Sequence, residues 1–424
     1  TVAGDDSIFF GYTSGGTNTL TNAAGATLNL SSTNATPLNF FTGSATLNNA
    51  GTLNQTVAGT HAITGNIAFN NTGAVNVDAG TLTVGGSGTD TGIYAVVEGA
   101  MLNFSGGTRN LNAGTNVTGL GSLTVSGATV NANNLLDIAA TGSSLTVSSG
   151  TLNIGANVLS GQLVAVTISG GTLNLNTANP VTLPSLTMSS GTLGGTGAVT
   201  VTGAFNVTGA ATLSGTGTFT TQGVSLVSMA GVTNQLSVSG GKQWINQNVL
   251  TLGSDDFITL SSNGTTLTNA VGATFNVSST FGTPLNFGGG TVTLNNAGTL
   301  NQTAAGAHTI SGGIIFNNTG TVNIDAGTLT IGGSGTDSGI YTVAEGSAIN
   351  FSGGTRNLNA GTNVTGLGSL SVSGATVNAN NLFDIAATGS GLTVSGGTLN
   401  IGANVISGQL VAVTISGGTL NLNT

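Results

Sequence analysis

The sequence predicts an all-β protein that folds as a parallel β-solenoid, because it combines a short repeat, alternating side chains and glycine-rich corners. Segments 123–131, 145–153, 166–174 and 186–194 are versions of one phrase, and equivalent threonines recur every 20 to 22 residues. Within a copy, Leu145 and Val147 alternate with Thr146, which is the pattern of a strand with one buried side. A period of this length is typical of one coil of a solenoid.

Each coil is expected to contain three strands. Residues 145–147 form the first strand, and a corner at Ser149 and Gly150 leads into a second strand at 151–154. A third apolar piece, 158–164, completes the coil. Each strand pairs with its equivalent in the next coil, about 4.8 Å away. The interior is then a stack of Leu, Val and Ile, the exterior carries Thr, Ser and Asn, and the chain makes roughly twenty coils.

The composition excludes several other classes of protein. Charged residues are 4% of the 424, far below the roughly 25% of ordinary soluble enzymes and signalling domains. The 72 glycines and the many Thr, Val and Asn residues disfavour helices. The hydrophobic content of 38% excludes intrinsic disorder. No apolar stretch is long enough for a transmembrane segment. Only 3 basic residues oppose 12 acids, so no nucleic-acid partner is expected.

A second, longer repeat divides the chain. Residues 54–177 align with 301–424 at a fixed offset, with about 20 differences in 124 positions. We expect a first long solenoid unit at 1–177, spacer coils that continue the solenoid at 178–250, and a second copy of the unit at 251–424. Several differences are apolar exchanges at inward positions, which a core tolerates: Val77 and Ile324, Val84 and Ile331, Leu136 and Phe383, and Leu159 and Ile406.

One phrase resembles a known family. Segment 76–86 and its copy 323–333 contain Ala-Gly-Thr-Leu-Thr followed by Val-Gly or Ile-Gly. This phrase resembles the repeats in passenger domains of bacterial autotransporters, and the Gly/Asn/Thr background is similar to filamentous-haemagglutinin-type adhesins. The resemblance implies a right-handed β-helix that is secreted and is extracellular or on a bacterial cell surface. The absence of Cys is compatible with export of an unfolded chain.

A glycine-rich motif suggests calcium. Segment 85–93 and its copy 332–340 approximate the nonapeptide calcium repeat of β-roll proteins, which makes Asp90 and Asp337 candidate calcium ligands. The motif departs from that repeat at Gly92, where a large apolar residue belongs, and it has no tandem neighbour. The favoured alternative is a Gly/Asp loop that projects between coils. No other cofactor is expected.

Few residues offer catalytic chemistry. Arg109 lies one coil beyond Asp90, so a salt bridge between coils is expected there and in the second copy. An enzyme that acts on polysaccharides would need carboxylates and a basic residue over a groove, and Asp90, Glu98 and Arg109 are the only candidate set. We expect no enzyme. His61 and His308 have no neighbouring ligand in the sequence, so they do not indicate a metal site.

Three aromatic residues are candidates for contact with a ligand or a neighbouring molecule. Trp244, Tyr94 and Tyr341 are of the types that stack on sugars or pack between surfaces. The alternative for each of them is local packing.

The favoured function is a secreted, non-catalytic structural solenoid that forms an extracellular fibre, stalk or adhesive rod. A solenoid edge accepts another coil, and neither Thr1-Val2 nor residues 421–424 have the pattern of a cap. End-to-end self-association is therefore expected, and low charge also permits lateral bundling. The alternative is a monomeric surface adhesin that binds glycans. An ice-binding protein with Thr and Asn rows and a polysaccharide-active enzyme are less favoured.

Overall fold

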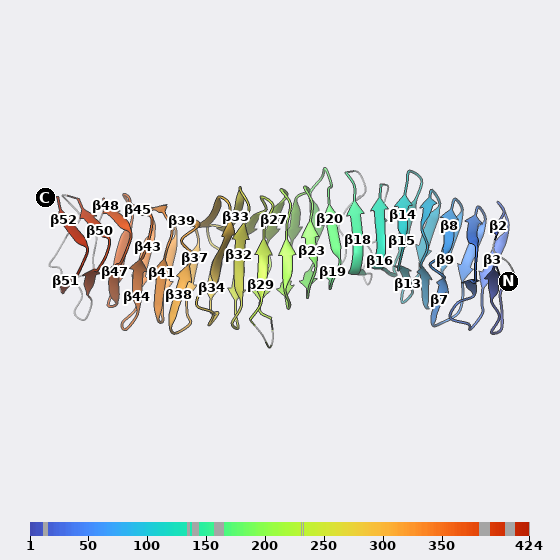
Figure 1. The fold of residues 1–424 in the computed structure, drawn as a ribbon, viewed down its shortest axis with the longest axis horizontal. Coiled ribbons are helices and arrows are strands. Elements are labelled where there is room, and N and C mark those ends of the chain that lie inside the picture. The colour runs from blue at the N-terminus through green and yellow to red at the C-terminus, as the bar shows by residue number, and fades with distance from the viewer. Residues whose placement is uncertain are drawn as a thin grey trace. The chain divides into compact units, whose positions relative to one another are not determined.

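The computed structural model describes residues 1–11, 16–133, 144–156, 165–229, 231, 233–380, 391–402 and 412–423, and the backbone alone at 136–137. These residues contain strands and no helix. The strands form two compact units, unit 1 (Thr1–Thr202) and unit 2 (Gly203–Thr424). Each unit is a parallel β-solenoid (Figure 1), which confirms the predicted fold class.

The strands of unit 1 fall into three stacks, and each strand pairs with the strand of the neighbouring turn. Stack A contains β1 (Ile8–Phe10), β4 (Leu38–Phe40), β7 (Thr60–Ile63), β10 (Thr81–Val84), β13 (Met101–Phe104), the first half of β16 (Ser122–Ala132) and of β18 (Ser144–Ile154), β19 (Ala165–Ile168) and β22 (Leu186–Met188). Stack B contains β2 (Thr17–Asn22), β5 (Ser44–Asn49), β8 (Ile67–Asn71), β11 (Gly88–Asp90), β14 (Thr108–Leu111), the second half of β16 and of β18, β20 (Thr172–Leu175) and β23 (Thr192–Gly194). Stack C contains β3 (Thr27–Leu30), β6 (Thr52–Gln55), β9 (Ala74–Val77), β12 (Ile93–Val96), β15 (Asn116–Gly119) and β17 (Leu136–Asp137), followed by the pair β21 (Val181–Leu183) and β24 (Val199–Val201).

Unit 2 also has three stacks, which are named after the unit 1 strands that their repeated sequences match. Stack A contains β26 (Ala211–Leu213), β29 (Gln235–Val238), β32 (Phe257–Ser261), β35 (Leu285–Gly289), β38 (Ala307–Ile310), β41 (Thr328–Ile331), β44 (Ala348–Phe351), β47 (Ser369–Val372), β49 (Leu392–Val394) and β51 (Val413–Ile415). Stack B contains β27 (Thr218–Thr221), β30 (Gln243–Asn246), β33 (Thr265–Asn269), β36 (Val292–Asn296), β39 (Ile314–Asn318), β42 (Gly335–Asp337), β45 (Thr355–Leu358), β48 (Thr376–Ala379), β50 (Thr398–Ile401) and β52 (Thr419–Leu422). Stack C contains β25 (Phe205–Val207), β28 (Ser225–Val227), β31 (Val249–Leu252), β34 (Thr274–Val277), β37 (Thr299–Gln302), β40 (Thr321–Ile324), β43 (Ile340–Val343) and β46 (Asn363–Gly366).

The turns are less uniform than the sequence period suggests. Paired residues in neighbouring turns are separated by as few as 18 positions, as for Val181 and Val199, and by as many as 30, as for Ile8 and Leu38. In the middle of unit 1 the separation is the expected 20–22 residues. For example, Leu145 in β18 pairs with Leu123 in β16, which is 22 positions earlier. Among the described residues, stack A nevertheless contains nine strands in unit 1 and ten in unit 2, close to the roughly twenty coils expected.

The core follows the alternation of the sequence. In β18, Leu145, Val147, Leu152 and Ile154 are fully buried, whereas the intervening threonines are half-buried on the outer side. The strand is continuous through the expected corner at Gly150, where a φ of 70° is accessible to glycine. A Cβ atom there would lie 2.3 Å from the Ala128 carbonyl oxygen.

Where the apolar residues that differ between the two long copies are described, their side chains point into the core. Val77 and Ile324 are fully buried, as are Val84 and Ile331, which confirms their predicted positions. The other two exchanged pairs, at 136 and 383 and at 159 and 406, lie outside the residues whose side chains are described.

We predict that Leu152→Ala lowers the free energy of unfolding by about 2–5 kcal/mol, because it leaves a cavity between neighbouring turns. The adjacent outward change, Thr151→Ala, should alter it by less than about 0.5 kcal/mol. Native-state hydrogen exchange of β16, β18 and β20 measures both effects in the turns concerned. Equal losses of protection in the two variants would contradict the inward assignment.

Candidate functional site

The interior of unit 1 contains a column of hydrogen-bonded asparagines as well as apolar side chains. Asn22, Asn49 and Asn71 end successive stack B strands, and all three are buried. Asn22 Nδ2 donates to Asn49 Oδ1 at 2.7 Å, and Asn49 Nδ2 donates to Asn71 Oδ1 at 2.8 Å. Each Nδ2 also donates to a backbone carbonyl oxygen, for example that of Thr52 at 2.9 Å. The column therefore satisfies polar groups that would otherwise be buried without partners.

The column leads to a buried ion pair. Asp90, in β11, is paired with Asn71 of the preceding turn, and Arg109 belongs to the turn that follows. Both Asp90 and Arg109 are fully buried. Asn71 N donates to Asp90 Oδ1 at 3.0 Å, and Arg109 Nε donates to Asp90 Oδ2 at 3.1 Å. Arg109 Nη2 contacts both carboxylate oxygens. This is the salt bridge between coils that the sequence predicts, now placed inside the solenoid.

Arg109 also has polar contacts beyond Asp90. Nη1 donates to the carbonyl oxygen of Gly86 at 3.2 Å, and Nη2 donates to the hydroxyl oxygen of Tyr94 at 3.2 Å. The guanidinium carbon lies 5.3 Å from the ring centre of Phe69 and 5.5 Å from that of Phe104. Aromatic faces attract a cation most strongly where water is excluded. We call Asp90, Tyr94 and Arg109 the Arg–Asp–Tyr cluster.

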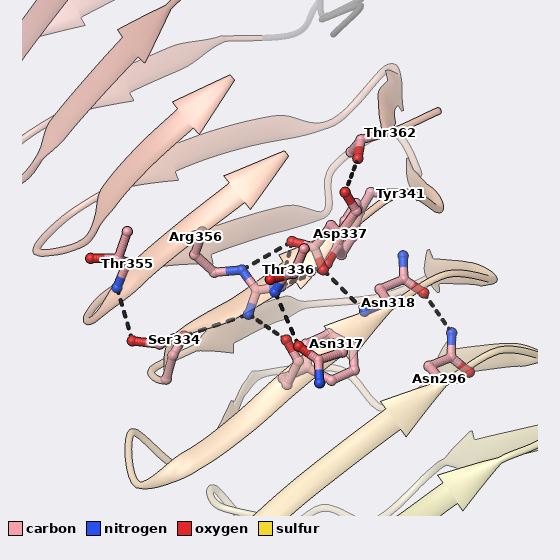
Figure 2. Close-up of polar contacts among 12 residues, drawn as sticks. Asn296, Asn317, Asn318, Ser334, Thr336, Asp337, Tyr341, Thr355, Arg356 and Thr362 are labelled. Carbon is pink, nitrogen blue, oxygen red and sulfur yellow. Dashed lines mark hydrogen bonds and ion pairs between the residues drawn. The ribbon is translucent and has the colours of Figure 1, made fainter. Parts of the chain in front are cut away.

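Unit 2 contains the same cluster, formed by Asp337, Tyr341 and Arg356. Figure 2 shows Asp337 between Arg356 and Asn318, with Tyr341 beside the guanidinium. Here Arg356 Nη1 also donates to the Phe316 carbonyl oxygen at 2.9 Å. The asparagine column of this unit is longer and consists of Asn246, Asn269, Asn296 and Asn318.

The local sequence explains why these charged residues point inward. Strand β14 reads Thr-Arg-Asn-Leu, whereas β20 reads Thr-Leu-Asn-Leu, so Arg109 stands where Leu173 does. Gly88 makes room for the guanidinium, since a Cβ atom there would lie 1.7 Å from the Phe69 carbonyl oxygen and 2.8 Å from Arg109 Nη1. Alignment of the Thr-x-Asn-x phrases alone would have revealed the inward position of Arg109.

Burial and the neighbouring groups shift the pKa values of Asp90 and Arg109 in opposite directions. Burial raises the pKa of the Asp90 carboxyl, and the facing Arg109 opposes that rise. Burial acts to lower the pKa of Arg109, but Tyr94 and Asp90 raise it above its usual value, so the guanidinium remains charged. Burial also raises the pKa of the Tyr94 hydroxyl, which therefore stays protonated. Both carboxylate oxygens accept from N–H donors, as those of an ionised carboxylate do.

These positions correct two expectations for Asp90 and Asp337. Neither aspartate lies in a projecting loop, because each is an inward residue of a stack B strand. Each carboxylate faces a guanidinium rather than an open calcium cage. In the described residues, no group of three or more His, Cys, Asp or Glu side chains is placed to hold a metal ion.

The candidate catalytic set is divided between the interior and the surface. Asp90 and Arg109 are together inside, whereas Glu98 is exposed at the corner after β12. The three residues therefore do not line a common groove.

The three candidate aromatic residues are also inside, which corrects the expectation of a surface contact. Trp244, Tyr94 and Tyr341 are all fully buried. The Trp244 ring packs against Phe205 at 5.8 Å between ring centres and against Phe219 at 6.0 Å. Its Nε1 donates to Thr221 Oγ1 at 3.3 Å. A sugar or a neighbouring solenoid cannot reach these rings without opening a turn.

The two histidines are buried and hydrogen-bonded. Gln55 Nε2 lies 2.7 Å from His61 Nδ1, and Gln302 Nε2 lies 2.9 Å from His308 Nδ1. Each Gln Nε2 also donates to a backbone carbonyl oxygen at 2.9 Å. Burial lowers the pKa of both histidines, so each is held neutral with Nδ1 as an acceptor.

All basic side chains of the protein are inside it. Arg109, Arg356 and Lys242 account for the 3 basic residues, and their exposures are 0%, 0% and 2%. Burial lowers the pKa of Lys242 to about 8. Every exposed charged side chain in the described part of the chain is consequently acidic.

No protein-family model, curated protein or solved structure matches this chain significantly. The described residues include no helix long and apolar enough to cross a membrane. The assignment of a function therefore depends on the residues and their geometry.

We predict that Arg356→Met lowers the stability of the surrounding turns by about 3–5 kcal/mol, because it leaves the Asp337 carboxylate buried without its cation. The adjacent outward change Thr355→Ala is the matched control and should cost less than about 0.5 kcal/mol. Native-state hydrogen exchange of β42 and β45 measures the loss of stability caused by each substitution. A loss of protection no larger than that of the control would show that the ion pair is dispensable.

We also predict that the protein becomes less stable as the pH falls from 7 to 5. In the unfolded chain a histidine has a pKa near 6.5, and burial lowers that of His61 and His308 in the folded state. The unfolded state then binds more protons in this interval, so stability is present above the unfolded pKa and is lost as the pH falls towards the folded pKa. Denaturant titrations at several pH values measure this slope.

The double variant His61→Gln, His308→Gln should abolish most of the pH dependence in that interval. The sequence contains 2 His and no Cys, so few other groups titrate there. An unchanged slope in the double variant would show that the histidines do not cause it. Burial raises the pKa of Asp90 and Asp337, so these carboxyl groups act in the opposite direction.

Proposed function

We propose that this protein is a non-catalytic structural β-solenoid that forms an extracellular fibre, stalk or adhesive rod by end-to-end stacking of turns. The observation that carries the proposal is the direction of its hydrogen bonds. Strand pairing, the interior asparagine column and an outer asparagine ladder all join one turn to the next. Such a molecule is strengthened by each turn added along its axis.

The edges of the strands support growth along the axis. Strand β52 has the same sequence as β20, Thr-Leu-Asn-Leu, and each pairs on one side with an equivalent strand. On its other side β20 also carries β23. A strand of this sequence can therefore carry a parallel strand on both of its edges, and strand edges are the usual sites of association between β proteins.

The placement of the reactive side chains is consistent with a structural role. Both histidines, all basic residues and the aspartates of the two Arg–Asp–Tyr clusters are buried in contacts that stabilise the turns. These side chains therefore stabilise the interior of the solenoid.

Secretion by a bacterial cell and display outside it are part of the same proposal. Two features support it: the phrase at 76–86 that resembles autotransporter passenger domains, and a sequence without Cys. Disulfide-free repeat proteins can cross a membrane unfolded and fold afterwards.

Electron cryo-microscopy of the full chain at increasing concentration tests the proposal. We expect fibres much longer than one chain, with a continuous axial repeat of about 4.8 Å. Sonicated fragments added to fresh protein should lengthen, since each break exposes new strand edges. Particles of single-chain mass at every concentration, with or without fragments, would overturn axial assembly and favour the monomeric adhesin.

A further inference from the structure

One corner of each unit is closed by a buried glutamine and a buried histidine. In unit 1, Gln55 ends the stack C strand β6, His61 lies in the stack A strand β7, and the largely exposed segment 57–59 joins them. We call this arrangement the Gln–His corner. Its copy in unit 2 consists of Gln302, segment 304–306 and His308.

The glutamine side chain holds the exposed segment to the interior. Gln55 Nε2 donates to the Val57 carbonyl oxygen at 2.9 Å and to His61 Nδ1 at 2.7 Å. The two corresponding bonds in unit 2 are both 2.9 Å. Among the described residues, no hydrogen bond between backbone groups reaches Val57 or Ala58. The position of the segment therefore depends on the amide of Gln55.

The histidine ring lies under the same segment. A Cβ atom on Gly59 would lie 3.6 Å from His61 Cε1, and the corresponding distance in unit 2 is 3.7 Å. Since His61 Nδ1 accepts from Gln55, the proton of the neutral ring is on Nε2. A hydrogen bond with the Ser32 backbone, in the preceding turn, acts to raise the pKa of His61, but burial lowers that pKa overall. The neutral ring therefore joins two turns.

Protonation of the histidine is incompatible with this arrangement. A charged imidazole has two N–H donors and no acceptor, so Nδ1 would then face the N–H donor of Gln55. Gln55 Oε1 is buried and has no hydrogen-bond partner among the described residues, and the same is true of Gln302 Oε1. A half-turn of the Gln55 amide brings Oε1 to the Nδ1 proton, but it also takes Nε2 away from the Val57 carbonyl oxygen. Segment 57–59 then loses the bond that holds it.

The charged groups on the turns around the corner are all acidic. The corner of the preceding turn, 31–37, contains no titratable side chain, and Asp5 and Asp6 lie beyond it with their carbonyl oxygens bonded to its side chains. The following turn contributes Asp78, whose N–H donates to the Gln55 carbonyl oxygen. These negative charges attract an imidazolium that reaches water when the corner opens. The equivalents in unit 2 are segment 278–284, Asp255, Asp256 and Asp325.

We propose that the Gln–His corner is a pH-sensitive latch, closed by the neutral histidine and released when the histidine binds a proton. The pH dependence of stability predicted from the two histidines concerns the whole chain, whereas the latch specifies which segments open first. It acts within each chain and does not depend on the assembly of fibres.

The size of the effect follows from the two states of the histidine. When the corner is open, the ring is in water and has a pKa near 6.5, whereas burial lowers this pKa when the corner is closed. The open state therefore binds more protons as the pH falls, so closure is favoured above pH 6.5 and is lost below it. Between pH 7 and pH 5 the ratio of open to closed corners rises by up to about 25-fold.

A nitroxide label on the exposed segment tests the latch in the full chain. The sequence contains no Cys, so the single variant Ala58→Cys is labelled at one position, and electron paramagnetic resonance measures the mobility of the label. Ala79→Cys is the matched control, because its corner has Val77 and Leu82 in place of the glutamine and the histidine. We expect the mobile fraction at position 58 to increase from pH 7 to pH 5 and that at position 79 to stay constant.

Two further substitutions in the Ala58→Cys background separate the latch from a general loosening. His61→Gln removes the group that binds the proton, so the label should have the same mobility at both pH values. Gln55→Glu removes the donor to Val57 and supplies a carboxylate that keeps His61 charged, so the label should be mobile already at pH 7. The latch is refuted by a label at position 58 that does not respond to pH, by a response that persists in His61→Gln, or by an immobile label in Gln55→Glu at pH 7. An equal response at position 79 would refute it too, since the whole unit would then loosen.

Discussion

The pairing of each strand with its equivalent one turn away is the constraint on which the rest of this structure depends. It requires every turn to present side chains of similar size at the same inward position, because strands are only about 4.8 Å apart. The apolar exchanges between the two long copies respect this limit, as where Val84 becomes Ile331 with both side chains fully buried. Conservative exchanges of this kind preserve the packing of neighbouring turns.

The same constraint governs the polar interior. A single buried asparagine would leave its amide donors and acceptor without partners. In a column, each side-chain amide donates a hydrogen bond to the amide of the next turn. The column in unit 1 leads to Asp90, whose carboxylate accepts from Asn71 N on one side and from Arg109 on the other. A carboxylate can only accept hydrogen bonds and a guanidinium can only donate them, so the column of amides ends at this pair. The Arg–Asp–Tyr cluster is therefore best understood as the termination of a polar column.

The sequence was sufficient for the fold because alternation and period are local signals. Leu145, Thr146 and Val147 already define an inner and an outer side, and the repeat determines which strands pair. The inward position of Asp90 was missed because a glycine-rich segment resembles a loop when it is considered alone. Its position is determined by Asn71 and Arg109 in the neighbouring turns, and contacts between turns are invisible within a short motif.

Burial of the basic residues also determines the character of the surface. With Arg109, Arg356 and Lys242 inside, nothing basic remains outside to pair with the exposed acids. Asp78 and Glu98 lie at the corner between stacks C and A of unit 1, and Asp325 and Glu345 lie at the corner between the stacks of the same names in unit 2. The cations therefore stabilise the interior, whereas these four acids lie at the surface. Both long copies carry these acids and the buried arginine at equivalent positions, so the same separation occurs in both units.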